Sequence, residues 1–376
     1  MLKEIYCPQT FRVNKEYPIY LGRNILEQLV DKIKPFKPNK VFLVSDTNVS
    51  ALYGSKVMGI LSQNFETFMF TVPAGEGNKT FQQYISLCNK LISSGITKRS
   101  FIIIMGGGVV GNLAGFAAST IMRGIDFAHL PTTVMAQVDS TTGGKQAVNM
   151  PQGKNLLGLF NDPKFILIDT YFLHTLPQRE FSCGFAECIK HALCQDEDFV
   201  NELFLKFNKE HRYSESDLLS IVERTIKLKI DLLKMDPKEI NEGKILVYGH
   251  TIGHAVETLS HGKLNHGESI SIGMIFAAKA SVALGFADKS LILVHEKVLT
   301  KAGLPIRIPD YIQSDNIVTQ LSYDKKLSPQ IELILLRQIG EPQAHEGRIG
   351  YPFNKERVLE LLLDQNTWDK ELYLPH

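Results

Sequence analysis

Two short apolar runs constrain the fold of this chain more than any other feature of its sequence. They are KVFLVSD, residues 40–46, and RSFIIIM, residues 99–105. Runs of this length, rich in β-branched residues, are typical of strands that are buried on both faces. Between them, TFQQYISLCNKLISSG, residues 80–95, has apolar residues at helical spacing. This strand–helix–strand order predicts a parallel sheet with helices on its faces.

The pattern changes after a further predicted strand, KFILIDT, residues 164–170. Downstream, SESDLLSIVERTIKLKIDLLKM (214–235) and GESISIGMIFAAKASVALG (267–285) repeat apolar residues every three or four positions, which predicts helices. Near the end, QIELILLRQIGEP (330–342) is compatible with a pair of strands that returns to the body of the protein.

With 376 residues the chain is long enough for two domains of ordinary size. We predict an α/β domain with a parallel, Rossmann-like sheet at residues 1–175, and a mainly α-helical domain at residues 176–376.

Composition excludes several classes of partner. The 41 basic and 40 acidic residues leave a formal net charge of +1, so no overall field attracts nucleic acid or an anionic membrane. The N-terminal segment has no apolar run of signal-peptide length, and no apolar stretch is long enough to span a bilayer. We therefore expect a cytoplasmic protein. An odd number of cysteines without a CxxC pair predicts buried thiols rather than disulfides; these are Cys7, Cys88, Cys183, Cys188 and Cys194.

A glycine-rich loop follows one predicted strand. FIIIMGGGVVGNLAGFAAST contains Gly106-x-Gly108-x-x-Gly111 between a strand pattern and a helix pattern. In that context glycines let the backbone approach a pyrophosphate, and the helix N-terminus offers unpaired N–H groups. A turn that is glycine-rich for steric reasons is the alternative. Asp46, at the end of another strand, is the candidate acceptor for a ribose hydroxyl.

Candidate metal ligands concentrate in YGHTIGHAVETLSHGKLNHGES, residues 248–269. His250 and His254 are one helical turn apart, His266 follows, and four of the 11 histidines of the chain lie in this segment. Neutral imidazoles together with a carboxylate suit Zn²⁺ with an open coordination position. The alternative is a helix end with exposed histidines, and this is our interpretation of His261.

Two further stretches carry lysines that require an explanation. In GFAECIKHAL, Glu187 and Lys190 share one face of a predicted helix, where an ordinary surface ion pair would be worth a few tenths of a kcal/mol. Their apolar neighbours instead favour a partly buried pair, a candidate metal ligand beside a proton-transfer or anion-binding lysine. In TTGGKQAVNMPQGKN, Lys145 and Lys154 lie in a turn-rich segment that we expect glycines and a proline to bend, and a lysine in a loop is ordinarily only a solvated charge.

These stretches, in this order, resemble the sugar-phosphate cyclases, the superfamily of 3-dehydroquinate synthase and 2-deoxy-scyllo-inosose synthase. The resemblance rests on GGGVVGNLAGFAAS, MRGIDFAHLPTT, AQVDSTTGGKQAVNMPQGKNLLG, LPQREFSCGFAECIKHAL, YGHTIGHAVE and HGESISIGM. It implies a carbon–oxygen lyase that eliminates phosphate and closes a carbocycle by an intramolecular aldol reaction. It also implies a homodimer, NAD that is restored in each turnover, and a divalent metal, Zn or Co. On this resemblance, the domain at residues 1–175 binds NAD and the domain at residues 176–376 binds metal and substrate.

The resemblance assigns roles position by position. The implied metal ligands are Glu187, His250 and His266. The implied cofactor-binding residues are Asp46, Asn48, Glu76, Lys79, Gly107, Gly108, Asn112, Thr132, Thr133 and Asp139. The implied substrate-binding residues are Arg123, Asp139, Lys145, Lys154, Asn155, Lys190, Lys229, His254 and Lys325 or Lys326, with Arg123 donated across the dimer interface. The implied catalytic residues are Lys145, Glu187, Lys190 and His254.

Departures from the family patterns bear on the substrate. The resemblance implies that dehydroquinate synthases have an aspartate where this chain has Asn112, a different residue at Gln146, and at Gly243 an arginine that pairs with the substrate carboxylate. A glycine cannot supply that bidentate fork. The sequence therefore favours a 2-deoxy-scyllo-inosose synthase-like enzyme that acts on glucose 6-phosphate.

Two alternatives stay open. VDSTTGGK and DKK point to 3-dehydroquinate synthase, acting on 3-deoxy-arabino-heptulosonate 7-phosphate, in which Lys244 would replace the arginine. Val247 fits neither cyclase pattern. A glycerol dehydrogenase-like, metal-dependent alcohol dehydrogenase would perform net redox chemistry. It would not need the implied phosphate-binding residues, which are Lys145, Lys154, Asn155 and Arg123.

Overall fold

The computed structural model of the chain folds as two compact units. It describes every residue except 1, 9–15, 209, 325–330 and 372–376. The first unit contains residues 1–180 and 214–226, and the second contains residues 181–213 and 227–376. Residues 214–226 thus belong to the first unit although they follow part of the second along the chain.

The first unit is built on a seven-stranded sheet in the order β1-β2-β9-β6-β5-β3-β4. Strands β1 and β2 pair antiparallel, and every other neighbouring pair is parallel. The two apolar runs form β3 and β5, with Val41 opposite Phe101, which confirms the predicted strand–helix–strand order. The strands are Lys3–Pro8 (β1), Glu16–Gly22 (β2), Val41–Asp46 (β3), Thr67–Val72 (β4), Phe101–Gly106 (β5), Asp126–Pro131 (β6) and Ile166–Asp169 (β9).

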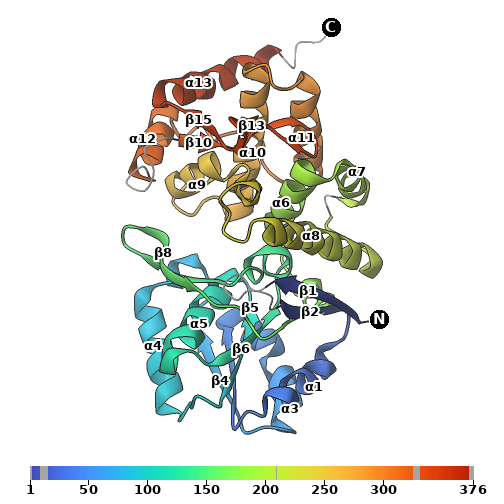
Figure 1. Cartoon of the computed structure of the whole chain (residues 1–376), viewed down its shortest axis with the longest axis vertical. Coiled ribbons are helices and arrows are strands. Elements are labelled where there is room, and N and C mark those ends of the chain that lie inside the picture. Colours follow the sequence, from blue (N-terminus) through green and yellow to red (C-terminus); the bar gives the residue numbers. More distant parts are fainter. Residues whose placement is uncertain (1, 9–15, 209, 325–330, 372–376) are drawn as a thin grey trace. The chain divides into compact units, whose positions relative to one another are not determined.

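Helices cover both faces of this sheet. Alternate residues of each strand face opposite sides, and β3 and β5 are buried at every position, so both faces are apolar. Val41 and Leu43 pack into one core cluster with α1 and α3, while Phe42 and Val44 pack into another with α4 and α5 (Figure 1). The helices of this unit are Leu29–Ile33 (α1), Thr47–Val49 (α2), Ser55–Ser62 (α3), Phe81–Ser93 (α4) and Gly108–Thr120 (α5).

A β-hairpin occupies the segment that the sequence marked as turn-rich. Strand β7, Lys145–Met150, pairs antiparallel with β8, Gly153–Phe160, so that Lys145 is opposite Phe160 and Met150 is opposite Gly153. The expected bends are present at the glycines before Lys145 and at the Pro-Gln turn, but the residues between them form a strand rather than a loop.

The second unit is mainly helical, as predicted. Its core is formed by α9, α10, α12 and α13 with two short strands, β10 and β15. The helices are Gln178–Gln195 (α6), Glu197–Lys206 (α7), Glu215–Met235 (α8, which runs through both units), His250–Leu259 (α9), His266–Ala283 (α10), Lys289–Lys301 (α11), Ser314–Asp324 (α12) and Lys355–Glu371 (α13).

Short strands complete the second unit. They pair as β10 with β15, β11 with β12 and β13 with β14, all antiparallel. The predicted strand pair near the C-terminus is thus present as β11 and β12, whereas β10 pairs with a later strand. The strands are Ile331–Leu333 (β10), Leu336–Gln338 (β11), Glu341–Pro342 (β12), Ala344–His345 (β13), Arg348–Ile349 (β14) and Tyr351–Phe353 (β15).

All five cysteines are buried free thiols, as predicted. Burial raises the pKa of Cys194, which disfavours the reactive thiolate. Across the described ranges, the helices are either too short or too polar to cross a bilayer.

His129, in β6, gives the fold a specific sensitivity to acid. Its Nε2 is buried and has no hydrogen-bond partner among the residues that the structure describes, and burial lowers its pKa to about 3. The unfolded chain takes up this proton near pH 6.5, so the free energy of unfolding falls as the pH drops from about 6.5 toward 3. We expect His129→Leu to reduce this loss by about 1.4 kcal/mol per pH unit, measured by urea unfolding at pH 5 and pH 7. An unchanged difference between the two pH values would contradict this assignment.

Candidate active site

Glu187, His250 and His266 converge in the second unit. Glu187 lies midway along α6, and His250 and His266 are the first residues of α9 and α10. Both imidazoles direct Nε2 at one carboxylate oxygen: Glu187 Oε1 is 3.5 Å from His250 Nε2 and 3.4 Å from His266 Nε2. Neither oxygen of this buried carboxylate completes a well-aligned hydrogen bond within the described residues. A carboxylate and two imidazole nitrogens that face one point fit a divalent metal such as Zn²⁺ or Co²⁺.

Glycines let the three helices approach closely enough for this convergence. A Cβ on Gly267, next to His266, would lie 2.2 Å from the carbonyl oxygen of Cys183 in α6. A Cβ on Gly273, further along α10, would lie 1.9 Å from the carbonyl oxygen of Gly249, just before α9. No side chain fits at either position, so backbone contact with both neighbours fixes where α10 begins.

Local capping sets the first residue of each helix that carries a histidine. Asn265 and Glu268 form a capping box: the Asn265 side chain accepts from Glu268 N–H (2.9 Å), and the Glu268 carboxylate accepts from Asn265 N–H (2.8 Å). This box holds His266 at the start of α10. Before α9, Gly249 adopts φ +78°, a left-handed conformation that favours glycine.

Burial and neighbouring charges set the protonation of the cluster. Burial opposes ionisation of Glu187, but the Lys190 ammonium and both histidines outweigh it and hold the pKa of the carboxyl well below its usual range. Burial lowers the pKa of His250. Burial also disfavours protonation of His266, but the nearby carboxylates of Glu187 and Glu257 outweigh it and raise that pKa to about 9. Binding of a metal cation would therefore displace a proton from His266.

The other nitrogen of each ring is already engaged. His250 Nδ1 lies 3.0 Å from the carbonyl oxygen of Tyr248, and His266 Nδ1 lies 3.2 Å from Glu257 Oε2. Such contacts orient imidazoles in metal sites and fix their tautomer. Lys190, 2% exposed, forms the predicted buried ion pair with Glu187, and its ammonium also donates to the carbonyl oxygen of Leu246 (2.7 Å).

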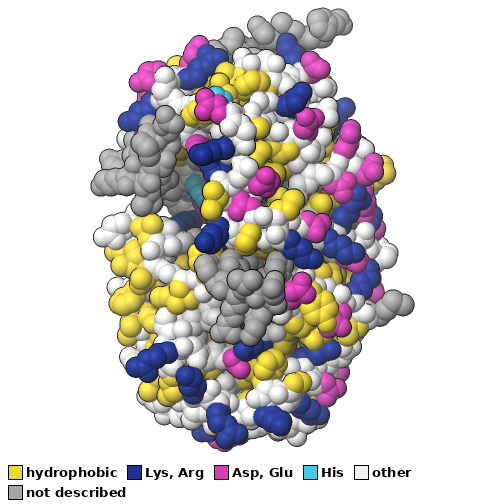
Figure 2. All heavy atoms as spheres, viewed as in Figure 1, with side chains coloured by type: hydrophobic (Ala, Val, Ile, Leu, Met, Phe, Trp, Pro, Cys, Tyr) yellow, Lys and Arg dark blue, Asp and Glu magenta, His cyan; other side chains and the backbone are white. Residues whose placement is uncertain are grey.

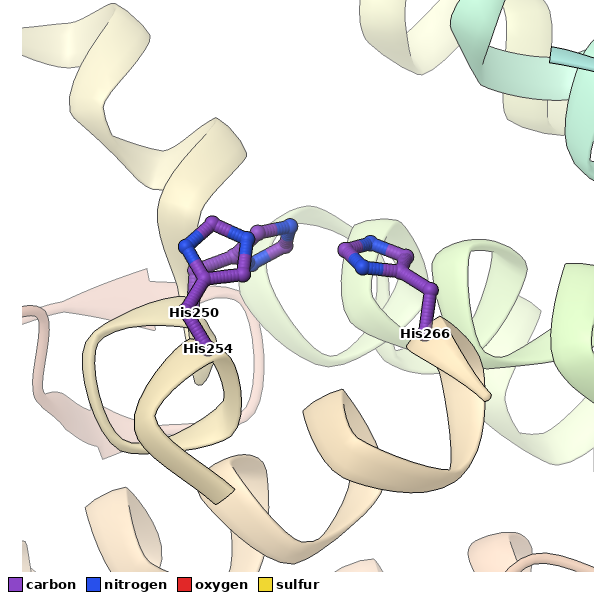
Figure 3. Close-up of side chains that lie close together, drawn as sticks. All are labelled: His250, His254 and His266. Atoms are coloured by element: carbon purple, nitrogen blue, oxygen red, sulfur yellow. The ribbon is translucent and has the colours of Figure 1, made fainter. Parts of the chain in front are cut away.

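His254 lies beside the same point but is exposed (Figure 3). Its ring centroid is 5.1 Å from that of His250 and 5.7 Å from that of His266. One nitrogen from each of these three rings lies within 4.8 Å of the others, so the three histidines form a second possible ligand set. The resemblance instead placed His254 at the substrate. Exposed His261 agrees with its interpretation as a surface histidine.

In the first unit, the glycine-rich loop joins β5 to α5. Gly107 is the N-cap of α5, where the described structure shows no side-chain cap, so N–H groups of the first turn are available to an anion. The steric explanation also applies, because a Cβ on Gly106 would lie 2.3 Å from Val110 Cγ1 and a Cβ on Gly108 would lie 3.0 Å from Ser140 Oγ. Packing therefore requires small residues here whether or not a nucleotide binds.

Asp46 has a structural role besides the predicted one. Its Oδ1 accepts hydrogen bonds from the backbone N–H of Asn48 (2.9 Å) and of Val49 (3.0 Å), which caps α2. A ribose hydroxyl would therefore meet Oδ2.

Residues predicted for cofactor and for substrate meet in one network around Lys79. This lysine is 4% exposed and donates to Asn112 Oδ1 (2.6 Å) and Asn155 Oδ1 (2.5 Å). Asn112 in turn donates from Nδ2 to the carbonyl oxygen of Lys145 (2.9 Å), which ties the network to the hairpin.

The two hairpin lysines are separated along the strands. Lys145 begins β7, and Lys154 lies at the tip end of β8, about 13 Å away along the hairpin. Both are exposed. At this separation the two lysines would contact different parts of one small ligand. Their roles in binding stay predictions.

The predicted residues divide between the two units. The first unit contains Asp46, Asn48, Glu76, Lys79, Gly107, Gly108, Asn112, Arg123, Thr132, Thr133, Asp139, Lys145, Lys154 and Asn155. The second contains Glu187, Lys190, Lys229, His250, His254 and His266. Lys325 and Lys326 lie outside the described residues.

The region of Gly243 is closed to a larger side chain. The Asp236 carboxylate accepts from the backbone N–H of Asn241 (2.6 Å) and of Gly243 (3.1 Å), and a Cβ on Gly243 would lie 2.8 Å from the Asp236 carbonyl oxygen. The neighbouring Lys244 pairs with Glu332, with Nζ 2.7 Å from Oε2. Neither position presents a guanidinium, and the Lys244 charge is already paired.

Gln146 packs inside the first unit. It is 2% exposed, and its Nε2 donates to the carbonyl oxygen of Asn161 (3.3 Å). A Cβ on Gly115 of α5 would lie 1.9 Å from Gln146 Oε1, so the amide lies directly against that helix. Its identity is therefore tied to packing between the hairpin and α5.

Known proteins resemble this chain along most of its length. Sequence models of the 3-dehydroquinate synthase N-terminal and C-terminal domains match residues 69–183 and 184–327. A 3-dehydroquinate synthase of Thermodesulfovibrio yellowstonii is 38% identical over 331 residues, 87% of this chain and 92% of that protein. A crystal structure of 2-deoxy-scyllo-inosose synthase complexed with carbaglucose-6-phosphate, NAD⁺ and Co²⁺ is 30% identical with a TM-score of 0.89, and the match covers 96% of this chain and 99% of that one.

A more distant likeness extends to dehydrogenases. The structure of a probable glycerol dehydrogenase from Sinorhizobium meliloti is 13% identical with a TM-score of 0.64, over 93% of this chain and 96% of that one. At this identity the likeness concerns the fold alone.

Proposed function

The chain belongs to the 3-dehydroquinate synthase family of sugar-phosphate cyclases, and from that membership we propose that it converts 3-deoxy-arabino-heptulosonate 7-phosphate to 3-dehydroquinate. The observation that supports this substrate is the 38% identity to a curated 3-dehydroquinate synthase, against 30% to the inosose synthase structure. This reverses the order in which the sequence motifs ranked the two substrates. The reaction class, a lyase that eliminates phosphate, is common to both.

We infer the same two cofactors that related structures contain. Glu187, His250 and His266 would hold the divalent metal, and the glycine-rich loop with Asp46 would bind NAD. When bound, the metal polarises substrate oxygens, and NAD takes up and returns a hydride. The buried ammonium of Lys190 provides a fixed positive charge beside the metal ligands, suited to stabilising an anionic oxygen.

One observation favours glucose 6-phosphate as a second candidate substrate. A heptulosonate carries a carboxylate, which calls for a cationic partner. Gly243 has no room for an arginine, and Lys244 is paired with Glu332. Glucose 6-phosphate has no carboxylate, so it would not need that partner.

Phosphate release distinguishes the candidates. With a catalytic amount of NAD and Co²⁺, we expect one phosphate per heptulosonate 7-phosphate and no net NADH, with kcat/KM at least about 10-fold above that for glucose 6-phosphate, a difference of about 1.4 kcal/mol in transition-state binding. Glu187→Gln provides the blank for contaminating phosphatase. A preference for glucose 6-phosphate would contradict the first proposal and support the second. Stoichiometric NADH would contradict both and indicate a dehydrogenase.

We also propose a homodimer. Support comes from hydrophobic side chains that gather on the surface over α4 and the β7–β8 hairpin (Figure 2). Exposed members of this surface are Phe81 (39%), Ile85 (41%), Leu156 (52%) and Phe160 (50%). Contiguous apolar surface of this kind commonly marks an interface between proteins. In that assembly Arg123 would be donated to the neighbouring subunit.

A further inference from the structure

A buried tyrosine–histidine pair lies behind one of the proposed metal ligands. Tyr248 and His295 are both 0% exposed, and the Tyr248 hydroxyl lies 2.8 Å from His295 Nε2. Tyr248 comes two residues before His250, whereas His295 lies in α11. Neither residue has a role in the proposed reaction so far.

The direction of this hydrogen bond follows from the other nitrogen of His295. Nδ1 lies 2.8 Å from the carbonyl oxygen of Leu291, and because a carbonyl oxygen only accepts, Nδ1 carries the proton. Burial lowers the pKa of His295 to about 4, so the ring is neutral and Nε2 is an acceptor. The Tyr248 hydroxyl therefore donates to His295; the alternative acceptor, the carbonyl oxygen of Met274, is more distant at 3.4 Å.

Tyr248 also contacts His250 directly, through its backbone. Its carbonyl oxygen accepts from His250 Nδ1 (3.0 Å), which places the ring proton on Nδ1 and leaves the Nε2 lone pair directed at Glu187 Oε1. Two residues earlier, the Leu246 carbonyl oxygen accepts from the Lys190 ammonium (2.7 Å). The segment from Leu246 to His250 is thus held by α6 on one side and by α11 on the other.

We propose that His295, through the Tyr248 hydroxyl, is a positioning residue that fixes the His250 imidazole for metal binding. The hydroxyl anchors the tyrosine ring, the anchored residue fixes the carbonyl, and the carbonyl sets the tautomer and direction of His250. The inference depends on the proposed metal centre. Hydrogen-bond partners of metal ligands commonly contribute a factor of about 10 to 100 in metal affinity.

Co²⁺ binding to the metal-free protein tests this proposal without use of activity. We expect Tyr248→Phe, which keeps the ring and removes only the hydroxyl, to weaken Co²⁺ affinity about 10-fold or more and to shift the visible bands of bound Co²⁺. His295→Leu should have the same effect. The double variant should bind no more weakly than either single variant, because both changes remove the same hydrogen bond.

Tyr213→Phe is the matched control. Tyr213 lies in the same unit, and its hydroxyl is 3.2 Å from Nδ1 of His211, so this variant also removes a tyrosine–histidine hydrogen bond. We expect its Co²⁺ affinity and spectrum to match those of the wild type.

Three outcomes would overturn the proposal. Unchanged affinity and spectrum in Tyr248→Phe would show that the pair only fills the core, and an equal loss in Tyr213→Phe would show a general effect on stability. Failure of the wild-type protein to bind Co²⁺ would overturn the proposed metal centre itself. The first two outcomes, in which the wild-type protein does bind Co²⁺, would overturn only the role of the Tyr248–His295 pair. If His295→Leu does not fold, Tyr248→Phe and its control are sufficient.

Discussion

Glu187→Gln is expected to abolish binding of the divalent metal and to reduce kcat/KM by about 10³-fold or more. The metal would contribute several kcal/mol to stabilising charge in the transition state, and each 1.4 kcal/mol corresponds to about tenfold in rate. A neutral amide oxygen is a poor replacement for the carboxylate oxygen that faces both Nε2 atoms, 3.4 and 3.5 Å away. Metal content of the purified protein and the rate of phosphate release measure the two effects.

Loss of stability should accompany the loss of metal. Lys190 is 2% exposed, and Glu187→Gln removes the carboxylate with which its ammonium pairs. Breaking a buried ion pair from one side typically costs about 3–5 kcal/mol. The substitution should therefore lower the free energy of unfolding of the metal-free protein by about that amount, measured by urea unfolding.

Glu202→Gln is the matched control for this substitution. Glu202 pairs with Lys206 one helical turn away (2.6 Å) on the partly exposed surface of α7. Such a pair is worth about 0.3–0.5 kcal/mol, so this variant should keep its metal and nearly all of its stability. Retention of a full equivalent of metal by Glu187→Gln would contradict our ligand assignment and indicate the alternative set of His250, His254 and His266.

Local patterns were sufficient to predict the sheet and the buried ion pair. The apolar runs of β3 and β5 identify themselves because both faces of each strand are buried, and the three-residue spacing of Glu187 and Lys190 places them on one face of a helix in any context. The apolar residues next to this pair in the sequence predicted that it is at least partly buried, and the structure buries both side chains. These features depend on residues that are close in sequence, which is why they could be predicted.

The hairpin and the Tyr248–His295 pair could not be predicted in this way. Every residue of β8 is exposed or half-buried, and no strict alternation of apolar and polar residues marks the strand. Tyr248 and His295 are 47 residues apart and meet only because α11 packs near the start of α9. No periodicity connects positions at that separation.

Three residues led the sequence analysis to favour glucose 6-phosphate, and the structure explains two of them by packing and hydrogen bonds within the protein. Gln146 contacts α5 and the carbonyl oxygen of Asn161, so its presence reflects how the hairpin packs. Asn112 binds Lys79 and the carbonyl oxygen of Lys145, so it too is explained within the first unit. Of the three positions, only Gly243 still bears directly on the substrate. One position supports glucose 6-phosphate less strongly than three independent positions would. This is consistent with relatives that favour 3-dehydroquinate synthase.

Gly273→Ala is expected to have a large effect on stability through a single methyl group. The added Cβ would lie 1.9 Å from the carbonyl oxygen of Gly249 and 2.8 Å from the backbone nitrogen of Gly253, and neither backbone atom can rotate away as a side chain can. The start of α9 and the body of α10 must therefore move apart. We expect a loss of about 3 kcal/mol or more in the free energy of unfolding, at the upper end of the range for overpacked cores.

The same movement should weaken metal binding, because His250 is the first residue of α9 and must stay aligned with Glu187 across this contact. Gly59→Ala is the control: Gly59 lies inside α3 in the other unit, and a Cβ there would meet nothing within 4 Å. Removing glycine from a helix without a steric conflict should stabilise the protein by about 0.5–1 kcal/mol. In urea unfolding, Gly273→Ala should therefore lower the free energy of unfolding and Gly59→Ala should raise it. In Co²⁺ titration, only Gly273→Ala should lose affinity for the metal. If Gly273→Ala were as stable as the wild type, α9 and α10 would have to be further apart than the structure places them, and the glycine contact could not be what aligns His250 with Glu187.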